Sequence, residues 1–266
     1  MKPIAVRFAF LGLAALAACS PAGGPQRQAP VEKANAVQVQ ATEYSFTMPN
    51  QVTGGVITFE MANIGGLPHE FAFGRLEEGT EPEEVIRAIQ QGKQPEGVED
   101  LAGVPVLGPQ MSTSMTRELD PGTYGFACFF PSPEGDPHVA HGMIKFFEVS
   151  GESEAALPHP DATVVATDEG FEVPEIGAGE QTLELRNDGQ EPHEFLLFSL
   201  EPGKKERDID RWFGSGLKGD APAVFPGGMQ SLDPGSSVFV TVELEAGRTY
   251  QLRDFESGFR AEITPA

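Results

Sequence analysis

Cysteine, which forms the disulfides of small secreted domains, and histidine, which builds centres of several metals, are both scarce in this sequence. Of its 266 residues only two are cysteine, five are histidine and one is tryptophan. Lysine and arginine number 18 against 40 aspartates and glutamates, which gives a formal net charge of -22. The phosphate backbone would repel so acidic a chain, so nucleic acid is excluded as a natural partner. The acidic excess fits steering toward a basic protein partner, and equally solubility or adaptation to a salty medium.

Long apolar runs are also absent, except at the N-terminus. Lys2 and Arg7 precede an apolar run that ends at residue 18 and is too short to span a bilayer as a mature helix. The run closes in LAAC (16–19), which resembles the bacterial lipoprotein signal. The resemblance implies that residues 1–18 are a signal peptide and that Cys19 is acylated. An ordinary secretory signal with a chance cysteine is the alternative.

Acylation of Cys19 would anchor the protein by lipid to a membrane of the bacterial cell envelope, on a periplasmic or extracellular face. Residues 19–36 show no hydrophobic periodicity and are predicted to be a flexible tether. Cys128 then has no partner for an internal disulfide. Because a lone thiol in an oxidising compartment is liable to oxidation, Cys128 is expected to be buried or bound to a metal.

The rest of the chain contains the same pattern twice. NIGGLPHEFAF (63–73) matches NDGQEPHEFLL (187–197) in register, and LDPGTYGFAC (119–128) matches LEAGRTYQLRD (244–254) with one insertion. Two homologous domains are therefore expected, each the size of a small β-sandwich.

The repeat also sets the expected domain boundaries. The first domain is predicted over 37–150 and the second over 161–266. The segment 151–160, which is rich in acidic residues and contains proline, is the expected linker.

Alternating apolar residues predict that both domains are built from strands. Residues 56–62 present one apolar face, and residues 123–130 place Tyr124, Phe126 and Cys128 on a single face. Glycine- and proline-containing turns separate the runs. We therefore expect an all-β protein of two tandem Greek-key β-sandwiches.

One short helical insertion is expected in each domain. In the first, Thr80 and Glu83 have the spacing of a capping box, Pro82 lies in the first turn, and Gly92 ends the helix. The second domain has its counterpart around residues 207–213.

One loop of the first domain concentrates residue types that bind metals. Cys128, His138 and Met143 lie within sixteen residues between two predicted strands, and His69 begins another strand. A Greek-key sandwich brings such loops together at one end. Two imidazoles, a thiolate and a weak axial thioether make a trigonal blue-copper site. His141 competes with His138, but it is too close to Met143 for both to reach one ion from an extended segment, so it is expected to face solvent.

The order of these motifs resembles that of the cupredoxins, of the plastocyanin and pseudoazurin type. The resemblance covers the whole first domain and rests on NxGxxPH, GTYGFAC and PHVAHGM, which end at residues 69, 128 and 143. It implies cupredoxin-like sandwiches and one type 1 copper ion. It also implies a set of four metal ligands, namely His69, Cys128, His138 and Met143.

The resemblance leads to three further expectations around this site. The segment 129–137 is longer than in plastocyanin, so it is expected to bulge outward. His138 is expected to reach the surface amid apolar side chains and to be the electron exit, as the loop histidine does in related proteins. Asn63 and Glu70 are either supports of the ligands or plain turn and surface residues.

The second domain lacks this ligand set. His193 takes the place of His69, but Asp254 replaces Cys128, and the closing segment 255–259 has neither histidine nor methionine. This domain is predicted to bind no copper and to be structural or to bind a partner. The alignment further predicts a hydrogen bond between His193 and Asp254 at one end of the sandwich.

The favoured function is a lipid-anchored, extracytoplasmic type 1 copper protein. It would carry single electrons between redox partner proteins of the cell envelope and bind no small-molecule substrate. The alternative is an envelope copper-handling protein, a chaperone, buffer or sensor, without an electron-transfer role; such proteins use open sites rich in methionine or histidine. An enzyme is not expected, because five histidines leave too few for a second, catalytic copper centre.

Overall fold

The computed structural model describes residues 35–266. The predicted signal peptide, the acylation site Cys19 and the predicted tether up to residue 34 lie outside the described residues. Within the described part, no helix combines the length and the apolar character needed to cross a membrane.

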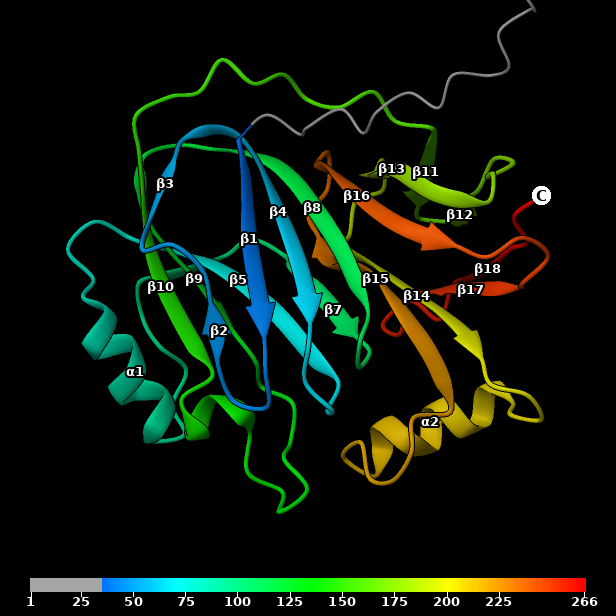
Figure 1. The fold of residues 1–266 in the computed structure, drawn as a ribbon, viewed down its shortest axis with the longest axis horizontal. Coiled ribbons are helices and arrows are strands. Elements are labelled where there is room, and N and C mark those ends of the chain that lie inside the picture. The colour runs from blue at the N-terminus through cyan, green and yellow to red at the C-terminus, as the bar shows by residue number, and fades with distance from the viewer. Residues whose placement is uncertain (1–34) are drawn as a thin grey trace, which may run out of the picture. The chain divides into compact units, whose positions relative to one another are not determined.

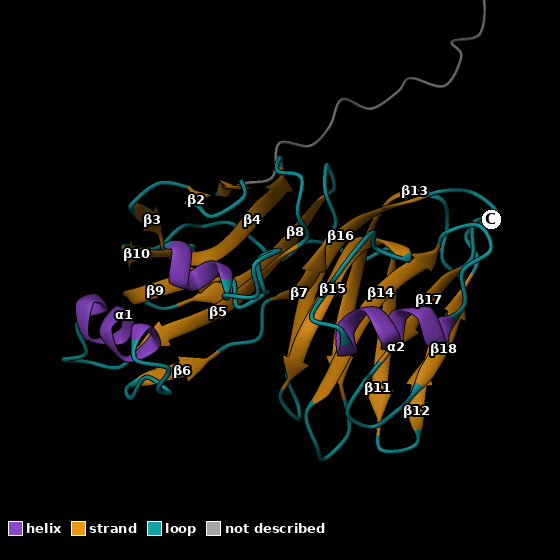
Figure 2. Ribbon diagram, turned by 90° about the horizontal axis from the view of Figure 1, so that it is seen from below, coloured by secondary structure: helices purple, strands orange, loops and turns teal. Residues whose placement is uncertain are grey.

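Strands dominate both repeats (Figures 1 and 2). The elements of the first repeat are β1 (Ala36–Ala41), β2 (Phe46–Thr47), β3 (Gln51–Thr53), β4 (Gly55–Asn63), β5 (His69–Leu76), α1 (Pro82–Gln90), β6 (Val98–Asp100), β7 (Val104–Leu107), β8 (Ser112–Leu119), β9 (Gly122–Ala127), the 3-10 helix η1 (His138–His141) and β10 (Ile144–Ser150). Those of the second are β11 (Ala162–Thr167), β12 (Gly170–Glu172), β13 (Gly179–Asn187), β14 (His193–Leu200), α2 (Glu206–Gly214), β15 (Ala223–Leu232), β16 (Ser237–Leu244), β17 (Tyr250–Arg253) and β18 (Arg260–Ile263).

The two repeats share one sheet. Its strand order is β12-β11-β13-β16-β8-β4-β1-β2. Counted from the outer edge of the sheet to the junction, each repeat supplies four strands in the same order. The parallel pair β1–β4 recurs as β11–β13. The repeats join where β8 pairs antiparallel with β16, as Figure 1 shows for the neighbouring arrows. Because this sheet and one core cluster contain residues of both repeats, the separate domains 37–150 and 161–266 stay a prediction.

Each repeat completes its sandwich with a second sheet. In the first repeat this is β3-β10-β9-β5-β6, with β7 paired to β5; in the second it is β15-β14-β17-β18. The strands β5 and β14 both begin at a histidine and follow the same turn. The tandem repeat therefore places His69 and His193 at equivalent points of two sandwiches.

The alternation seen in the sequence accounts for the core of the first repeat. Tyr124, Phe126 and Cys128 are each at most 2% exposed, as one buried face of β9 and its extension requires. Phe126 packs against Phe59 and Phe73 with ring centroids 5.3 and 4.8 Å apart. Full burial of one such side chain contributes about 1.5–3 kcal/mol, so the aromatic cluster is a rigid support for the residue that follows β9.

The helices lie where they were expected, but one cap differs. Pro82 begins α1, and α2 covers the predicted segment. The predicted capping box of Thr80 and Glu83 is wrong, because Glu81 is the N-cap and makes no side-chain cap hydrogen bond. Proline at the first helical position starts the helix one residue later than the motif indicated, since its fixed φ already suits the first turn.

Candidate metal centre

The loop before β5 holds His69 through a buried asparagine. Asn63, 1% exposed, donates from Nδ2 to the carbonyl oxygens of Leu67 at 2.8 Å and Leu107 at 3.0 Å. Its Oδ1 accepts the N–H of Gly65 at 3.0 Å. These three bonds fix the turn that ends at His69, so Asn63 supports a ligand position and is not a plain turn residue.

The loop after β9 folds back onto Cys128. The N–H of Cys128 donates to the carbonyl of Met143 at 3.1 Å, and its carbonyl accepts the N–H of Val139 at 2.8 Å. The N–H of His138 donates to Phe130 at 2.8 Å, and that of Met143 to His138 at 3.1 Å. Local backbone bonds thus bring together residues up to fifteen positions apart.

The residues between Cys128 and His138 form an outward excursion. Pro131 and Pro137 face each other in an isolated β-bridge. Residues 133–137, which end at the second of these prolines, are exposed. The bulge predicted for 129–137 is therefore present, and the bridge closes it at its base. The excursion leaves the positions of Cys128 and His138 fixed to each other.

Three of the four predicted ligands meet in the core. His69 Nδ1 lies 3.2 Å from His138 Nδ1, and Cys128 Sγ lies 3.9 Å from the first nitrogen and 3.4 Å from the second. All three side chains are at most 1% exposed. Among the described residues they form the one group of potential ligands that converges on a common point. Met143, the fourth, is 0% exposed and is tied to Cys128 and His138 through its backbone.

This triangle fits a metal ion. Metal–nitrogen and metal–sulfur bonds of about 2.0–2.3 Å allow ligand atoms with these separations to share one ion. The Nε2 atoms of His69 and His138 are buried without a hydrogen-bond partner in the described structure. If both Nδ1 atoms are acceptors, each ring keeps its proton on Nε2, and two lone pairs and a sulfur face one point. A cation at that point would bind the two Nδ1 lone pairs, which otherwise face each other in a buried site at a cost.

Burial keeps all three groups neutral when no cation is bound. It lowers the pKa of His69 to about 4, with the nearby His138 adding to the effect. It also lowers the pKa of His138, and His141 adds to that. Burial, reinforced by Glu70, raises the pKa of Cys128 to about 12. The thiol must therefore lose its proton to become a ligand, so cation binding at this site releases protons and weakens as the pH falls.

The expectation that His138 reaches the surface is wrong. His138 is 1% exposed, and the ring of Tyr44 lies over it with centroids 5.2 Å apart. His141 is exposed, as predicted, and packs against the same tyrosine at 4.6 Å. No sequence pattern indicated this cover, because Tyr44 lies in a turn far along the chain from either histidine. Phe129, the residue after Cys128, is 49% exposed and reaches solvent instead.

Glu70 is a support of the ligand loop rather than a surface residue. It is 8% exposed, and its Oε1 accepts the backbone N–H of Phe129. Burial raises the pKa of Glu70 to about 7, against the lowering effect of the hydrogen bonds from Phe129 and Gln230. Glu70, which follows His69, is thereby hydrogen-bonded to Phe129, which follows Cys128.

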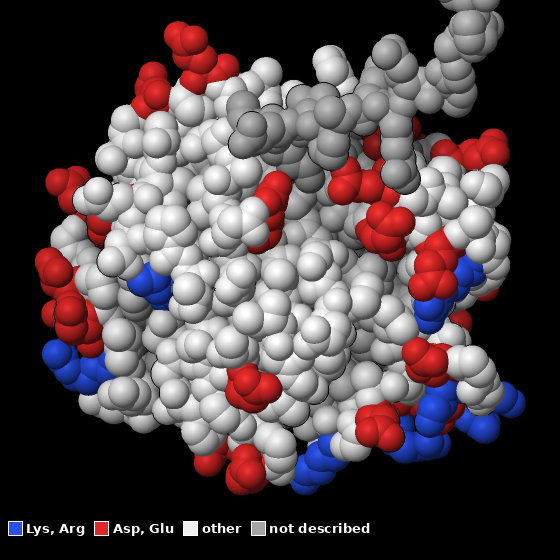
Figure 3. All heavy atoms as spheres, in the orientation of Figure 1, with Lys and Arg blue, Asp and Glu red and all other residues white. Residues whose placement is uncertain are grey.

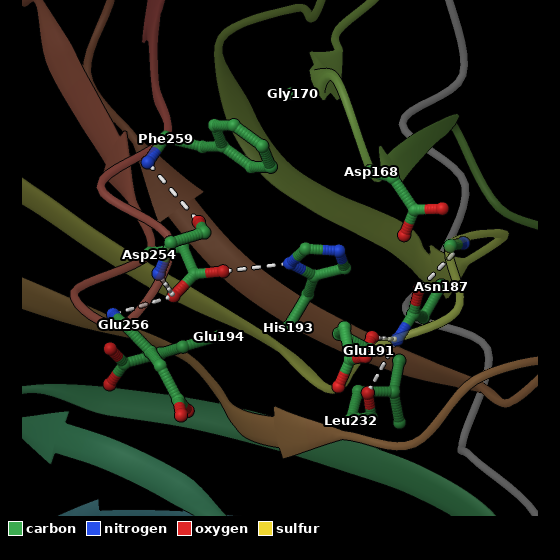
Figure 4. A network of polar contacts seen from close by, with 12 residues as sticks. Asp168, Gly170, Asn187, Glu191, His193, Glu194, Leu232, Asp254, Glu256 and Phe259 are labelled. Carbon is green, nitrogen blue, oxygen red and sulfur yellow. Dashed lines mark hydrogen bonds and ion pairs between the residues drawn. The ribbon is translucent and has the colours of Figure 1, made fainter.

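The second repeat keeps the scaffold and replaces the ligands. His193 Nδ1 lies 2.8 Å from Asp254 Oδ2, which confirms the predicted pair (Figure 4). Asn187 repeats the bonds of Asn63, to Glu191 and Leu232 at 2.8 Å. Burial alone would raise the pKa of Asp254, but hydrogen bonds from His193 and from the backbone of residues 256 and 257 hold it below its usual value. A hydrogen-bonded pair thus occupies the place of the Cys128 cluster.

Glu194 repeats the position of Glu70 and makes stability depend on pH. Burial raises the pKa of Glu194 to about 7, which the N–H of Phe255 partly offsets and Asp254 reinforces. Because the folded pKa exceeds the unfolded one, this group's contribution to stability is full below about pH 4.3 and is lost as the pH rises to 7. We expect Glu194→Gln to raise the free energy of unfolding at pH 8 by up to about 3 kcal/mol. Denaturant titration at pH 4 and pH 8 measures it.

Glu191→Gln is the matched control, since Glu191 is exposed and three residues away. Equal effects of the two substitutions at pH 8 would contradict the assignment of the pH dependence to Glu194.

Comparison with known proteins finds copper proteins among the solved structures. No protein family and no curated protein sequence matches the chain. Among solved structures, reduced auracyanin from Roseiflexus castenholzii is 22% identical and covers 44% of this chain and 97% of its own, with a TM-score of 0.32. The fold is cupredoxin-like. A multicopper oxidase is 14% identical over 87% of this chain and 88% of its own, with a TM-score of 0.28.

The cupredoxin-like repeats confirm the predicted fold class and the resemblance drawn from the motifs. They also correct one expectation. Copper nitrite reductase from Nitrosomonas europaea, 14% identical with a TM-score of 0.25, covers 87% of this chain and 93% of its own. Since structural neighbours that span most of this chain include such enzymes, the expectation that the chain is not an enzyme does not stand. The histidine count of one chain was insufficient ground for it.

Proposed function

We propose that the first cupredoxin-like repeat holds one type 1 copper ion and passes single electrons between redox proteins of the cell envelope. The observation that carries the proposal is the buried triangle of His69 Nδ1, His138 Nδ1 and Cys128 Sγ. Copper would supply one-electron redox chemistry there. Two imidazoles with one thiol, beside a buried methionine, are the donor set of such a site.

The chain's own part is to hold the ligands still. Asn63, the backbone bonds around Cys128 and the aromatic cluster under β9 keep the ligand atoms in one arrangement. Ligands that do not rearrange between two oxidation states favour fast electron transfer. Burial excludes water from the centre, and Tyr44 closes it above His138.

The location and the partners belong to the same proposal. The lipoprotein-like N-terminus with Cys19 supports a lipid anchor on an extracytoplasmic membrane face. Figure 3 shows acidic side chains spread over the visible face and not gathered in one patch. On that face, the charge therefore favours solubility over a single docking patch for a basic partner.

The test is a visible spectrum, metal analysis and voltammetry of the copper-loaded full-length chain. We expect one copper per chain, an intense thiolate-to-copper band and a fast, reversible couple. Copper bound without that band would contradict the type 1 site. A band without a reversible couple would support copper handling instead. Two coppers per chain would contradict the assignment of a single site to the first repeat.

A further inference from the structure

A residue of the second repeat makes contact with the ligand loops of the first. Gln230 lies on β15, and its Nε2 donates to Glu70 Oε2 at 3.1 Å across 160 positions of sequence. The other oxygen of Glu70 accepts the N–H of Phe129. Glu70 follows His69 and Phe129 follows Cys128, so one carboxylate joins the two ligand segments and Gln230 holds that carboxylate.

Gln230 is itself held in place. Its Oε1 accepts the N–H of Gly103 at 3.0 Å, and its backbone N–H donates to the carbonyl of Gly103 at 2.7 Å. The bond from Gly103 fixes the amide orientation, because a backbone N–H requires the oxygen on its side and leaves Nε2 facing Glu70. A side chain at Gly103 would place its Cβ 1.8 Å from the carbonyl oxygen of Phe71, so only glycine allows this approach.

The strand geometry also directs Gln230 out of the regular ladder. His193 of β14 pairs with Leu232 of β15, and Phe195 pairs with Met229, so β15 has one residue more than β14 in this interval. Gln230 lies in that interval. Bulges of this kind re-aim side chains and are frequent beside functional sites.

The second repeat provides an internal comparison. Glu194, equivalent to Glu70, accepts the N–H of Phe255, the residue after Asp254, at 3.3 Å. Within residues 35–266, no glutamine donates to Glu194 in the way that Gln230 donates to Glu70. The amide contact is therefore an addition at the repeat that has the cysteine.

We propose that Gln230 is a positioning residue for the metal centre of the first repeat. By holding the Glu70 carboxylate against the N–H of Phe129, it fixes the backbone on which Cys128 Sγ is carried. Partners beyond the ligands orient them and tune the metal they bind. The second repeat, which lacks the ligand set, would thus determine the spectrum and the reduction potential of the first. This inference rests on the proposed copper site.

The test replaces Gln230 in the copper-loaded full-length chain and records the thiolate band, the electron paramagnetic resonance spectrum and the reduction potential. Gln230→Met keeps the length of the side chain and removes the amide. We expect it to retain one copper, to shift the band and to change the potential. The matched control is Gln251→Met, which breaks an exposed glutamine–glutamate hydrogen bond of 2.8 Å to Glu262 in the second repeat and should change none of the three.

A double variant that exchanges the two side chains distinguishes a positioning role from a general loss of structure. Gln230→Glu alone sets two carboxylates against each other and should disturb the spectrum. Adding Glu70→Gln restores one donor and one acceptor, with Phe129 and Gly103 still able to donate to side-chain oxygens, so the double variant should return toward wild type.

The outcomes separate this inference from the proposed function. A Gln230→Met protein with the wild-type spectrum and potential would overturn the positioning role, as would a double variant no closer to wild type than Gln230→Glu. A wild-type protein without a thiolate band would instead overturn the copper site itself.

Discussion

Cys128→Ala is expected to abolish the visible colour of the copper-loaded protein completely. The intense absorption of a blue-copper site is charge transfer from the cysteine thiolate to copper, and no other thiol lies in the ligand triangle. The two remaining imidazoles should hold copper far more weakly, since the sulfur is the ligand that favours the reduced ion. The visible spectrum and the copper content per chain measure both effects.

Cys19→Ala is the control for this experiment, because it removes the other cysteine of the chain. It should leave the band unchanged. An intense band that survives in Cys128→Ala would show that the colour arises elsewhere and would contradict the site.

His138→Ala and His141→Ala are expected to differ widely, although both residues lie on η1. His138 Nδ1 lies 3.2 Å from His69 Nδ1 and 3.4 Å from Cys128 Sγ, whereas His141 is exposed. Loss of a supporting residue around a metal typically costs about 10–100-fold in affinity, so loss of the ligand His138 should cost more. His141→Ala should keep both the band and the affinity.

Competition with a chelator of known copper affinity measures the two variants side by side. Each can be compared with the wild type at one and the same pH, because metal binding that requires loss of a thiol proton depends on pH. If His141→Ala loses the band and His138→Ala keeps it, the ligand assignment is wrong.

The local features of the fold followed from the sequence. The strand at 56–62, the buried face of Tyr124, Phe126 and Cys128, and the segment around 207–213 were all predictable, because side-chain periodicity is a local property. The repeat made Asp254 the counterpart of Cys128, and the observed bond to His193 confirms that alignment. The capping box at Thr80 failed because a competing local rule, proline at the first helical position, set the start of α1.

The candidate ligand set was also proposed from the chain alone, because three of its members lie in one loop whose backbone bonds link residues of the same segment. What could not be read was the environment of that set. Tyr44 over His138, Glu70 beneath Phe129 and the shared sheet from β8 to β16 all depend on contacts between distant segments. No periodicity or motif encodes such contacts, since the packing of whole sheets decides them.

The sequence by itself determined the two repeats, their strands, and the residues His69, Cys128, His138 and Met143 as one candidate ligand set. Only the tertiary structure decided that His138 is covered, and that Gln230 of the second repeat holds Glu70 of the first. The physical reason is the range of the interactions: propensity and alternation act over a few residues, whereas the Gln230–Glu70 bond exists only after both sandwiches have formed and β8 has paired with β16.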